Sequence, residues 1–370
     1  MHTFKIAPKI VSLDTACEFA EMYNIGKGDL VITSEHIWSK YFKNITPDNV
    51  IYIRNYCIGE PNDEAIKGIC ADIKNPYSRV IAVGGGTVAD IAKLFALDVS
   101  NSLNKVLDAL FDKEIDAKKD KKLVIVPTTC GTGSEITNIS IVEFINRRTK
   151  FGLASDSLFA DDAVLIPELL NDLPFKAFAA SSIDALIHSV ESFLSPKASA
   201  LSEMFSVSAM QSILSGYVKI KNGENIDYKK FLEASTYAGI AFSNAGCAAV
   251  HALSYPLGAA FHVPHGEANY AVFTGVFNMY MNLAPNGKIT RINKIFADIL
   301  GCDECNVYNG LEQLLNESVL QKKALHEYGM KKEQISEFAK SVLKNQQRLL
   351  ANNYVKLDLE QITQIYTNLY

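Results

Sequence analysis

Three of the chain's seven histidines fall within fifteen positions, in the segment HALSYPLGAAFHVPH at 251–265. They are His251, His262 and His265, and Pro256, Gly258 and Pro264 lie between them. Neutral imidazole is the commonest metal ligand in proteins. Because the prolines and glycines predict that the chain leaves one helix and turns back, we expect His265 to approach His251. The segment therefore predicts two metal ligands, with His262 left over.

A carboxylate and a fourth histidine occur upstream, in SSIDALIHSVES at 181–192. Asp184 and His188 are four residues apart, which places both side chains on one face of a helix. By themselves they would be interpreted as an ion pair or as a hydrogen-bonded histidine. Together with His251 and His265 they offer one oxygen and three nitrogen ligands, a set that suits Fe²⁺ or Zn²⁺ and leaves room for a substrate oxygen.

Two glycine-bearing segments favour a phosphate-containing cofactor. In VIAVGGGTVADIAK, at 80–93, a strand runs through three glycines into a helix, and a helix N-terminus with closely approaching backbone attracts phosphate. PTTCGTGSE, at 127–135, follows another buried strand and supplies four hydroxyl groups. Because ligands of open α/β sheets bind beyond the carboxyl ends of the strands, we expect the two loops at neighbouring strand ends, in a crevice sized for a dinucleotide.

The elements that must position these groups change type along the chain. Short β-branched runs alternate with helical patterns in the first half, as in a doubly wound parallel sheet. The expected strands are 29–33, 50–54, 79–86 and 122–129, and the expected helices between them include 61–73 and 87–97. Beyond Pro174 the pattern becomes helical, and the helix that carries Asp184 is expected to begin at Ser181 or Ser182 and to end at Pro196.

Length and composition limit the number of domains, the kinds of partner and the compartment that we expect. A chain of 370 residues exceeds one hydrophobic core, so two domains are expected, at 1–176 and 177–370. A net charge of −5 and the absence of a basic patch with stacking aromatic residues argue against nucleic acid as a partner. No apolar run is long enough to cross a membrane, no signal peptide is evident and the seven cysteines are scattered, so we expect a cytoplasmic protein with reduced thiols.

These segments resemble the iron-containing (group III) alcohol dehydrogenases over nearly the whole chain. The shared motifs are GGGTVADIAK, PTTCGTGSE, DALIH and HALSYPLG followed by PHGEAN. Within that family, IGEPNDE at 58–64 and HVPHGEANY at 262–270 are most similar to the 4-hydroxybutyrate dehydrogenases. The resemblance implies a Rossmann-like dinucleotide-binding α/β domain followed by an all-α domain, in the dehydroquinate synthase-like architecture, and hydride transfer between NAD and a small primary alcohol.

The resemblance also implies roles for individual residues. It assigns metal ligation, with Fe²⁺ favoured over Zn²⁺, to Asp184, His188, His251 and His265. It places the following residues at the cofactor: Ser34, Asn62, Gly85, Gly86, Thr87, Asp90, Thr128, Thr129, Thr132 and Lys150. Lys150 is expected on the nicotinamide side. Since Glu35 after Ser34 would repel a 2′-phosphate, NAD is favoured over NADP.

One departure from the family concerns proton transfer. Many members carry a histidine four residues after the ligand that matches His251, and this chain has Tyr255 there. The proton relay that the family has at this position is therefore not expected here. Tyr255 and His262 are the candidate catalytic residues: His262 as a proton carrier, and His262, Tyr255 or Arg348 as the contact to a substrate carboxylate. A small-molecule substrate and a homo-oligomer are expected. The alternatives left open are a butanol or propanediol dehydrogenase, a dehydroquinate synthase-like lyase and an inactive binding protein.

Overall fold

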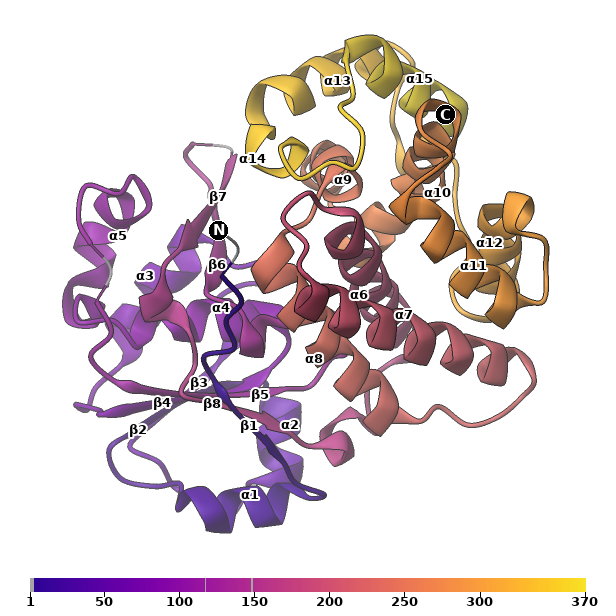
Figure 1. Cartoon of the computed structure of the whole chain (residues 1–370). Coiled ribbons are helices and arrows are strands. Elements are labelled where there is room, and N and C mark those ends of the chain that lie inside the picture. Colours follow the sequence, from indigo (N-terminus) through magenta and orange to yellow (C-terminus); the bar gives the residue numbers. More distant parts are fainter. Residues whose placement is uncertain (1–2, 117, 148) are drawn as a thin grey trace. The chain divides into compact units, whose positions relative to one another are not determined.

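The structure is a computed structural model that describes residues 3–116, 118–147 and 149–370. It divides into two compact units (Figure 1). One unit is Ile6–Leu173, and the other is Pro174–Tyr370 together with the described residues before Ile6. The first unit holds all the named strands, and the second is helical.

The first unit is built on a six-stranded sheet in which every pairing is parallel. Its strand order is β1-β8-β5-β4-β2-β3. The strands are β1 (Lys9–Ser12), β2 (Asp29–Thr33), β3 (Asn49–Tyr52), β4 (Arg79–Gly84), β5 (Lys122–Pro127) and β8 (Asp162–Leu165). The central strands β2, β4 and β5 are almost wholly buried, because helices cover both faces of the sheet.

Two hydrophobic cores fill the space between the sheet and its helices. On one face lie α3 (Asp63–Asp72), α4 (Gly86–Phe95) and α5 (Leu103–Phe111), and on the other lie α1 (Ala16–Tyr23) and α2 (Glu35–Tyr41) (Figure 1). Alternate residues of each strand contribute to opposite cores: in β4, Val80 and Ala82 face one core, whereas Ile81 and Val83 face the other. The predicted doubly wound parallel sheet is thus confirmed.

The sequence prediction missed several short elements. The edge strand β1 and strand β8 have four residues each, too few to stand out from the surrounding chain. An antiparallel hairpin of β6 (Ile139–Phe144) and β7 (Thr149–Ala154) forms a separate two-stranded sheet, which was not predicted. The strand expected at 50–54 ends at Tyr52, where a 3₁₀ turn over Ile53–Asn55 begins.

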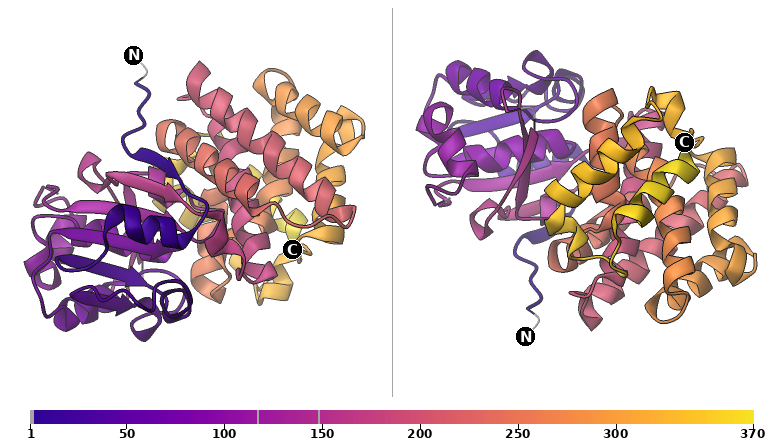
Figure 2. Two further views of the ribbon diagram at one scale, coloured as in Figure 1. Left: turned by 90° about the horizontal axis from the view of Figure 1, so that it is seen from below. Right: turned by 90° about the horizontal axis from the view of Figure 1, so that it is seen from above.

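The second unit contains only helices among its described residues (Figure 2). They are α6 (Phe175–Leu194), α7 (Ala200–Lys221), α8 (Tyr228–Ala245), α9 (Ala249–Phe261), α10 (His265–Leu283), α11 (Lys288–Leu300), α12 (Val307–Ser318), α13 (Gln334–Asn345), α14 (Gln347–Leu350) and α15 (Leu359–Leu369). Helix α10 packs against α6 and α9, which brings the three segments with the predicted metal ligands together.

Helix α6 begins earlier than predicted. Its first residue is Phe175, after Pro174, so neither Ser181 nor Ser182 is the N-cap. Both hydroxyls instead bond within the helix, since Ser181 Oγ donates to the carbonyl of Phe178 and Ser182 Oγ to that of Ala179. A serine inside a helix can donate its hydroxyl to a carbonyl one turn earlier, so a serine in the sequence does not by itself mark the start of a helix. The helix ends at Leu194, just before Ser195 and Pro196, as expected.

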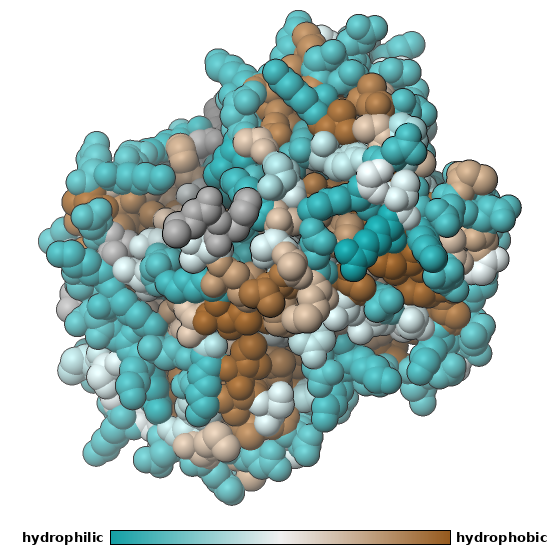
Figure 3. Space-filling model, in the orientation of Figure 1, coloured by the Kyte–Doolittle hydropathy of each residue, from teal (hydrophilic) through white to brown (hydrophobic). Residues whose placement is uncertain are grey.

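Hydrophilic side chains cover most of the face shown in Figure 3, with hydrophobic side chains gathered in patches between them. No described helix combines the length and the apolar character that crossing a membrane requires.

Candidate functional site

The four predicted metal ligands come from three helices of the second unit. Asp184 and His188 lie one turn apart on α6, His251 lies in the first turn of α9, and His265 is the first residue of α10. The chain leaves α9 at Phe261 and starts α10 only four residues later, so the predicted turn back is confirmed. The turn lies at 262–264, whereas Pro256 and Gly258 lie inside α9 and do not end it.

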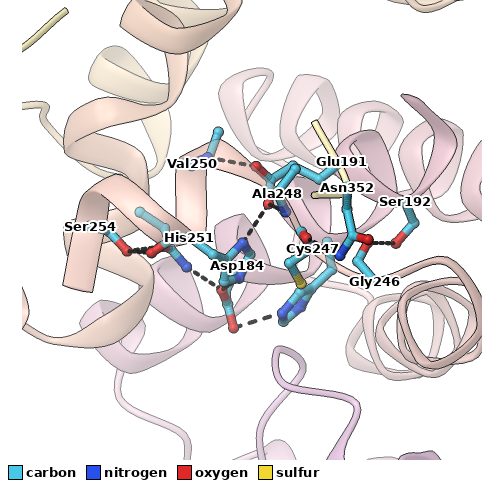
Figure 4. A network of polar contacts seen from close by, with 12 residues as sticks. Asp184, Glu191, Ser192, Gly246, Cys247, Ala248, Val250, His251, Ser254 and Asn352 are labelled. Atoms are coloured by element: carbon cyan, nitrogen blue, oxygen red, sulfur yellow. Dashed lines mark hydrogen bonds and ion pairs between the residues drawn. The ribbon is translucent and has the colours of Figure 1, made fainter. Parts of the chain in front are cut away.

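Asp184 lies at the centre of this group (Figure 4). Its Oδ1 atom is 3.5 Å from His251 Nε2 and 3.6 Å from His265 Nε2, and its Oδ2 atom is 3.8 Å from His188 Nδ1. Asp184, His188 and His251 are buried, whereas the side chain of His265 remains 34% exposed. Of these four side chains, that of His265 is therefore the most accessible to solvent.

Electrostatics within the pocket favour ionised groups. Burial alone would raise the pKa of Asp184, but the imidazoles of His188, His265 and His251 outweigh burial and hold that pKa well below its usual range. Burial opposes a charged His251, but contacts with Cys247, Asp184 and Glu191 raise its pKa well above the ordinary value. Positive charge thus collects around a buried carboxylate, and a divalent cation can replace the protons that supply it.

The residues present fit a divalent metal ion. Ligand atoms of Asp184, His251 and His265 all lie within 4.8 Å of one another. The Nε2 atom of His251 is buried and makes no well-formed hydrogen bond among the described residues. The rings of His188 and His251 stack with centroids 4.6 Å apart and planes 19° apart. Since a bound ion lies near the plane of each imidazole, these two rings must tilt to share one ion.

Glu191 orients His251 and was missed by the sequence analysis. Its Oε2 atom is 2.6 Å from His251 Nδ1, and its carboxylate also accepts hydrogen bonds from the backbone N–H groups of Ala248 and Val250 (Figure 4). A carboxylate that accepts from Nδ1–H leaves the Nε2 lone pair for a metal. The sequence does carry a signal for this residue, because Glu191 follows Asp184 by seven positions and therefore lies on the same helix face.

Asn269, on α10, holds the carboxylate of Asp184 by a hydrogen bond. This fully buried residue lies one turn after His265 on α10, and its Nδ2 atom donates to Asp184 Oδ1 at 2.7 Å. Its Oδ1 atom accepts a short hydrogen bond from Ser254 on α9. Neither Asn269 nor Ser254 was predicted to belong to the site, because a single Asn or Ser in a helix has no distinctive spacing.

Gly266 sets how closely α10 approaches α6. A Cβ atom at this position would lie 1.9 Å from the carbonyl oxygen of Ala180, a distance at which the two helices would have to separate. Ala180 is one turn before Asp184, and Gly266 follows His265 directly. The contact therefore fixes the distance between the ligand on α10 and those on α6.

The two predicted catalytic residues differ in position. Tyr255 lies one turn after His251 on α9, and its ring centroid is 6.1 Å from that of His265, so the structure brings it beside the pocket. His262 ends α9 with a positive φ of 53°, and its side chain is exposed. No hydrogen bond or ion pair joins the His262 side chain to another described residue. Arg348 is exposed on α14.

The two candidate cofactor loops lie side by side in the first unit. Gly84 and Pro127 pair at the carboxyl ends of β4 and β5, as expected for neighbouring strands. The loops touch closely, because a Cβ atom at Gly86 would lie 2.8 Å from Thr132 Cγ2 and one at Gly85 would lie 3.2 Å from Thr129 Cγ2. The segment 127–135, here called the threonine loop, thus packs against the N-terminus of α4. A Cβ atom at Gly86 would displace the side chain of Thr132.

Several other residues assigned to the cofactor are engaged within the protein. Asp90 accepts hydrogen bonds from Ser134 Oγ at 2.5 Å and from the backbone N–H of Ile141 at 2.9 Å, and so holds the threonine loop against α4. Asn62 and Ser34 cap α3 and α2 with their side-chain oxygens. Thr87 Oγ1 donates to the carbonyl of Gly59, Lys150 pairs with Glu60, and Thr128 is buried with its backbone N–H bonded to Gly84.

Known proteins resemble this chain along its whole length. It is 48% identical to 4-hydroxybutyrate dehydrogenase of Clostridium kluyveri, with each chain fully covered. It is 38% identical to long-chain-alcohol dehydrogenase 1 of Geobacillus thermodenitrificans over 56% of this chain and 53% of that one. Among solved structures, sulfoacetaldehyde reductase of Bifidobacterium kashiwanohense in complex with NAD⁺ has the same fold, with a TM-score of 0.85, 21% identity and coverage of 100% and 98%.

Two family descriptions account for nearly all of the sequence. Residues 12–167 match "Iron-containing alcohol dehydrogenase", and residues 178–370 match "Fe-containing alcohol dehydrogenase family, C-terminal". The paired loops at the ends of β4 and β5 and the aspartate–histidine pocket agree with these matches. The chain belongs to the iron-containing alcohol dehydrogenase family.

Proposed function

We propose that this protein is a metal-dependent oxidoreductase that transfers a hydride between NAD(H) and the pair 4-hydroxybutyrate and succinate semialdehyde. The observation that carries the substrate is the 48% identity to 4-hydroxybutyrate dehydrogenase over the full length of both chains. The buried carboxylate with three converging imidazoles supports the requirement for a metal ion. When bound, that ion supplies Lewis-acid polarisation of the substrate oxygen, and NAD⁺ supplies the hydride acceptor.

The ligands in this proposal are Asp184, His188, His251 and His265. Asp184 contributes the negative charge, and Asn269 holds it in place through Oδ1. Glu191 keeps the proton of His251 on Nδ1, so that Nε2 faces the pocket. The partial exposure of His265 supports entry of the substrate from its side.

The phosphate groups of the cofactor would lie at the N-terminus of α4. Gly85 and Gly86 let the backbone approach the ligand closely, and the helix dipole favours its negative charge. Thr129 and Thr132 lie against these glycines and are placed to offer hydroxyls. NAD is favoured over NADP, since Glu35 begins α2 at an exposed position where it would repel a 2′-phosphate.

The substrate carboxylate requires a hydrogen-bond donor or a positive charge. We propose His262 for this contact, because it lies in the short turn three residues before His265, and Tyr255 for the proton at the reacting oxygen, because its ring lies beside that of His265. Arg348 is not part of this proposal, because its exposed side chain is on α14, which carries none of the four candidate ligands.

A substrate panel tests this function. NADH formation is measured after Fe²⁺ reconstitution with 4-hydroxybutyrate, 1-butanol and 1,3-propanediol, which differ in the group at the far end. We expect kcat/KM for 4-hydroxybutyrate to exceed that for 1-butanol by about ten- to a hundredfold, since a hydrogen bond to a charged group contributes about 1.5–3 kcal/mol. Equal values for the three alcohols would exclude recognition of the carboxylate.

We also propose that the enzyme works as a homo-oligomer, a dimer or larger, in the cytoplasm. Light scattering coupled to size-exclusion chromatography measures the first property directly. A monomer mass for the active protein would contradict it.

A further inference from the structure

A cysteine adjoins the metal pocket, although the family resemblance assigns none to it. Cys247 lies in the turn between α8 and α9, and its side chain is buried. Its sulfur and ring nitrogens of His188 and His251 all lie within 4.8 Å of one another (Figure 4). This spacing is close enough for three atoms that bind one ion.

The backbone holds Cys247 firmly in this position. Asn352 Nδ2 donates to the carbonyl of Cys247 at 2.9 Å, and Glu191 binds the next backbone N–H, that of Ala248. The residue before it, Gly246, has a φ of 82°, and a Cβ atom there would lie 2.5 Å from Asn352 Nδ2. The sulfur is thus directed at the two imidazoles by a turn that has little freedom to move.

A second observation points to a ligand at the same place. His251 Nε2 is buried, and its contact with Asp184 Oδ1, at 3.5 Å, is too long for a well-formed hydrogen bond, so the atom can accept a ligand. Its ring stacks on that of His188, so both imidazoles border the sulfur.

The pocket therefore contains two overlapping sets of ligand atoms. Asp184, His251 and His265 form an oxygen-containing set, and His188, Cys247 and His251 form a sulfur-containing set. Carboxylate and imidazole suit Fe²⁺ and Mn²⁺, whereas thiolate selects softer ions such as Zn²⁺ and Cd²⁺.

We propose that Cys247 is a metal ligand for soft divalent cations, and that it binds them together with His188 and His251. The proposal rests on the proposed function only in placing the ion in the same pocket. It follows that the sulfur should coordinate a soft ion such as Cd²⁺ and should not coordinate a harder ion such as Mn²⁺. Replacing the thiol should therefore weaken Cd²⁺ binding by at least about tenfold and leave Mn²⁺ binding within about twofold.

Cadmium titration of the metal-stripped protein tests this directly, because a thiolate bound to Cd²⁺ gives an ultraviolet charge-transfer band. The half-buried Cys302 and the exposed Cys305 could add such a band, so all proteins carry Cys302→Ser and Cys305→Ser. In this background we compare the parent with Cys247→Ser and with a matched control, Cys70→Ser on α3.

We expect the parent and the Cys70→Ser control to develop the band with the first equivalent of Cd²⁺, and Cys247→Ser to lack it. Should Cys247→Ser fail to fold, the ¹¹³Cd resonance of the parent decides, since sulfur ligation moves it far downfield. One bound Cd²⁺ without the band or the downfield shift would refute the role of Cys247 but leave the metal pocket standing. A parent that binds Mn²⁺ but no Cd²⁺ would likewise refute the role of Cys247, whereas a parent that binds neither ion would refute the metal pocket as well.

Discussion

Glu191 accepts hydrogen bonds from the His251 imidazole and from two backbone N–H groups at the start of α9. One carboxylate thus positions both the ligand and the helix that carries it. Residues in this role matter nearly as much as the ligands, because they fix the tautomer and the orientation of the ring. Metal binding therefore depends on the residues that position the ligands as well as on the ligands themselves.

Replacing Glu191 with Gln tests this role. The amide can present its N–H group to His251 and thereby favour the wrong tautomer, so we expect metal affinity to fall about 10–100-fold. The dissociation constant for Mn²⁺, measured by competition with a chelating dye, gives the result. Glu203→Gln on α7 is the matched control, since Glu203 pairs with Lys288 and Arg291 instead. Unchanged affinity in Glu191→Gln would contradict the role.

His262→Asn separates the two functions considered for that histidine. Asparagine tolerates the positive φ of 53° at this position, so the backbone should persist. If His262 contacts the substrate carboxylate as proposed, we expect a higher KM for 4-hydroxybutyrate and little change with 1-butanol. A fall in kcat with a flattened pH profile would indicate proton transfer instead. If both parameters and the pH profile are retained, His262 has neither role.

At the scale of elements, two glycines control how closely functional segments approach one another. Gly266 allows α10 to touch the backbone of α6, and Gly86 allows the threonine loop to cross the start of α4. Gly266 lies beside a candidate metal ligand, and Gly86 lies in a candidate cofactor loop. A change in spacing at either glycine should therefore change the affinity for the metal ion or for NADH.

Gly266→Ala should displace α10, because the new Cβ would meet the Ala180 carbonyl at 1.9 Å. We expect a loss of about 1–3 kcal/mol in unfolding free energy, as for other overpacked sites, together with weaker metal binding. Gly258→Ala on α9 is the control, since its Cβ would make only an ordinary contact of 3.6 Å with the Val263 carbonyl. Equal stability and metal affinity in both variants would contradict the proposed spacing.

Gly86→Val should disturb the cofactor loop by a similar clash, with Thr132. We expect NADH affinity, followed by cofactor fluorescence, to fall tenfold or more, the equivalent of about 1.4 kcal/mol. Gly26→Val provides the comparison, since nothing lies within 4 Å of a Cβ there. Unaltered NADH affinity in Gly86→Val would count against cofactor binding at this loop.

The sequence predicted the elements that carry strong periodic or compositional signals. The strand expected at 29–33 and the turned-back histidine segment are confirmed, and the strand expected at 122–129 is present but ends at Pro127. The start of α6 was wrong because its serines satisfy their hydroxyls inside the helix. Glu191, Asn269 and Cys247 were missed because their roles arise only when α6, α9 and α10 pack together, which no local pattern encodes.

At the scale of the whole molecule, the two units divide the chemistry between them. The parallel sheet of Ile6–Leu173 carries both candidate cofactor loops, and the helices of Pro174–Tyr370 carry the four candidate ligands. Membership of the iron-containing alcohol dehydrogenase family covers both units. The central claim is that the NAD-linked reaction requires a metal ion held by the four ligands.

Metal content and NADH formation, measured on the same samples of metal-stripped protein before and after addition of Fe²⁺, test that claim most directly. The wild-type chain should take up a stoichiometric amount of iron and, only then, oxidise 4-hydroxybutyrate. Asp184→Asn should lose both properties, because the amide removes the negative charge on which three imidazoles converge. Full activity in the metal-free wild type, or in Asp184→Asn without bound iron, would contradict the account.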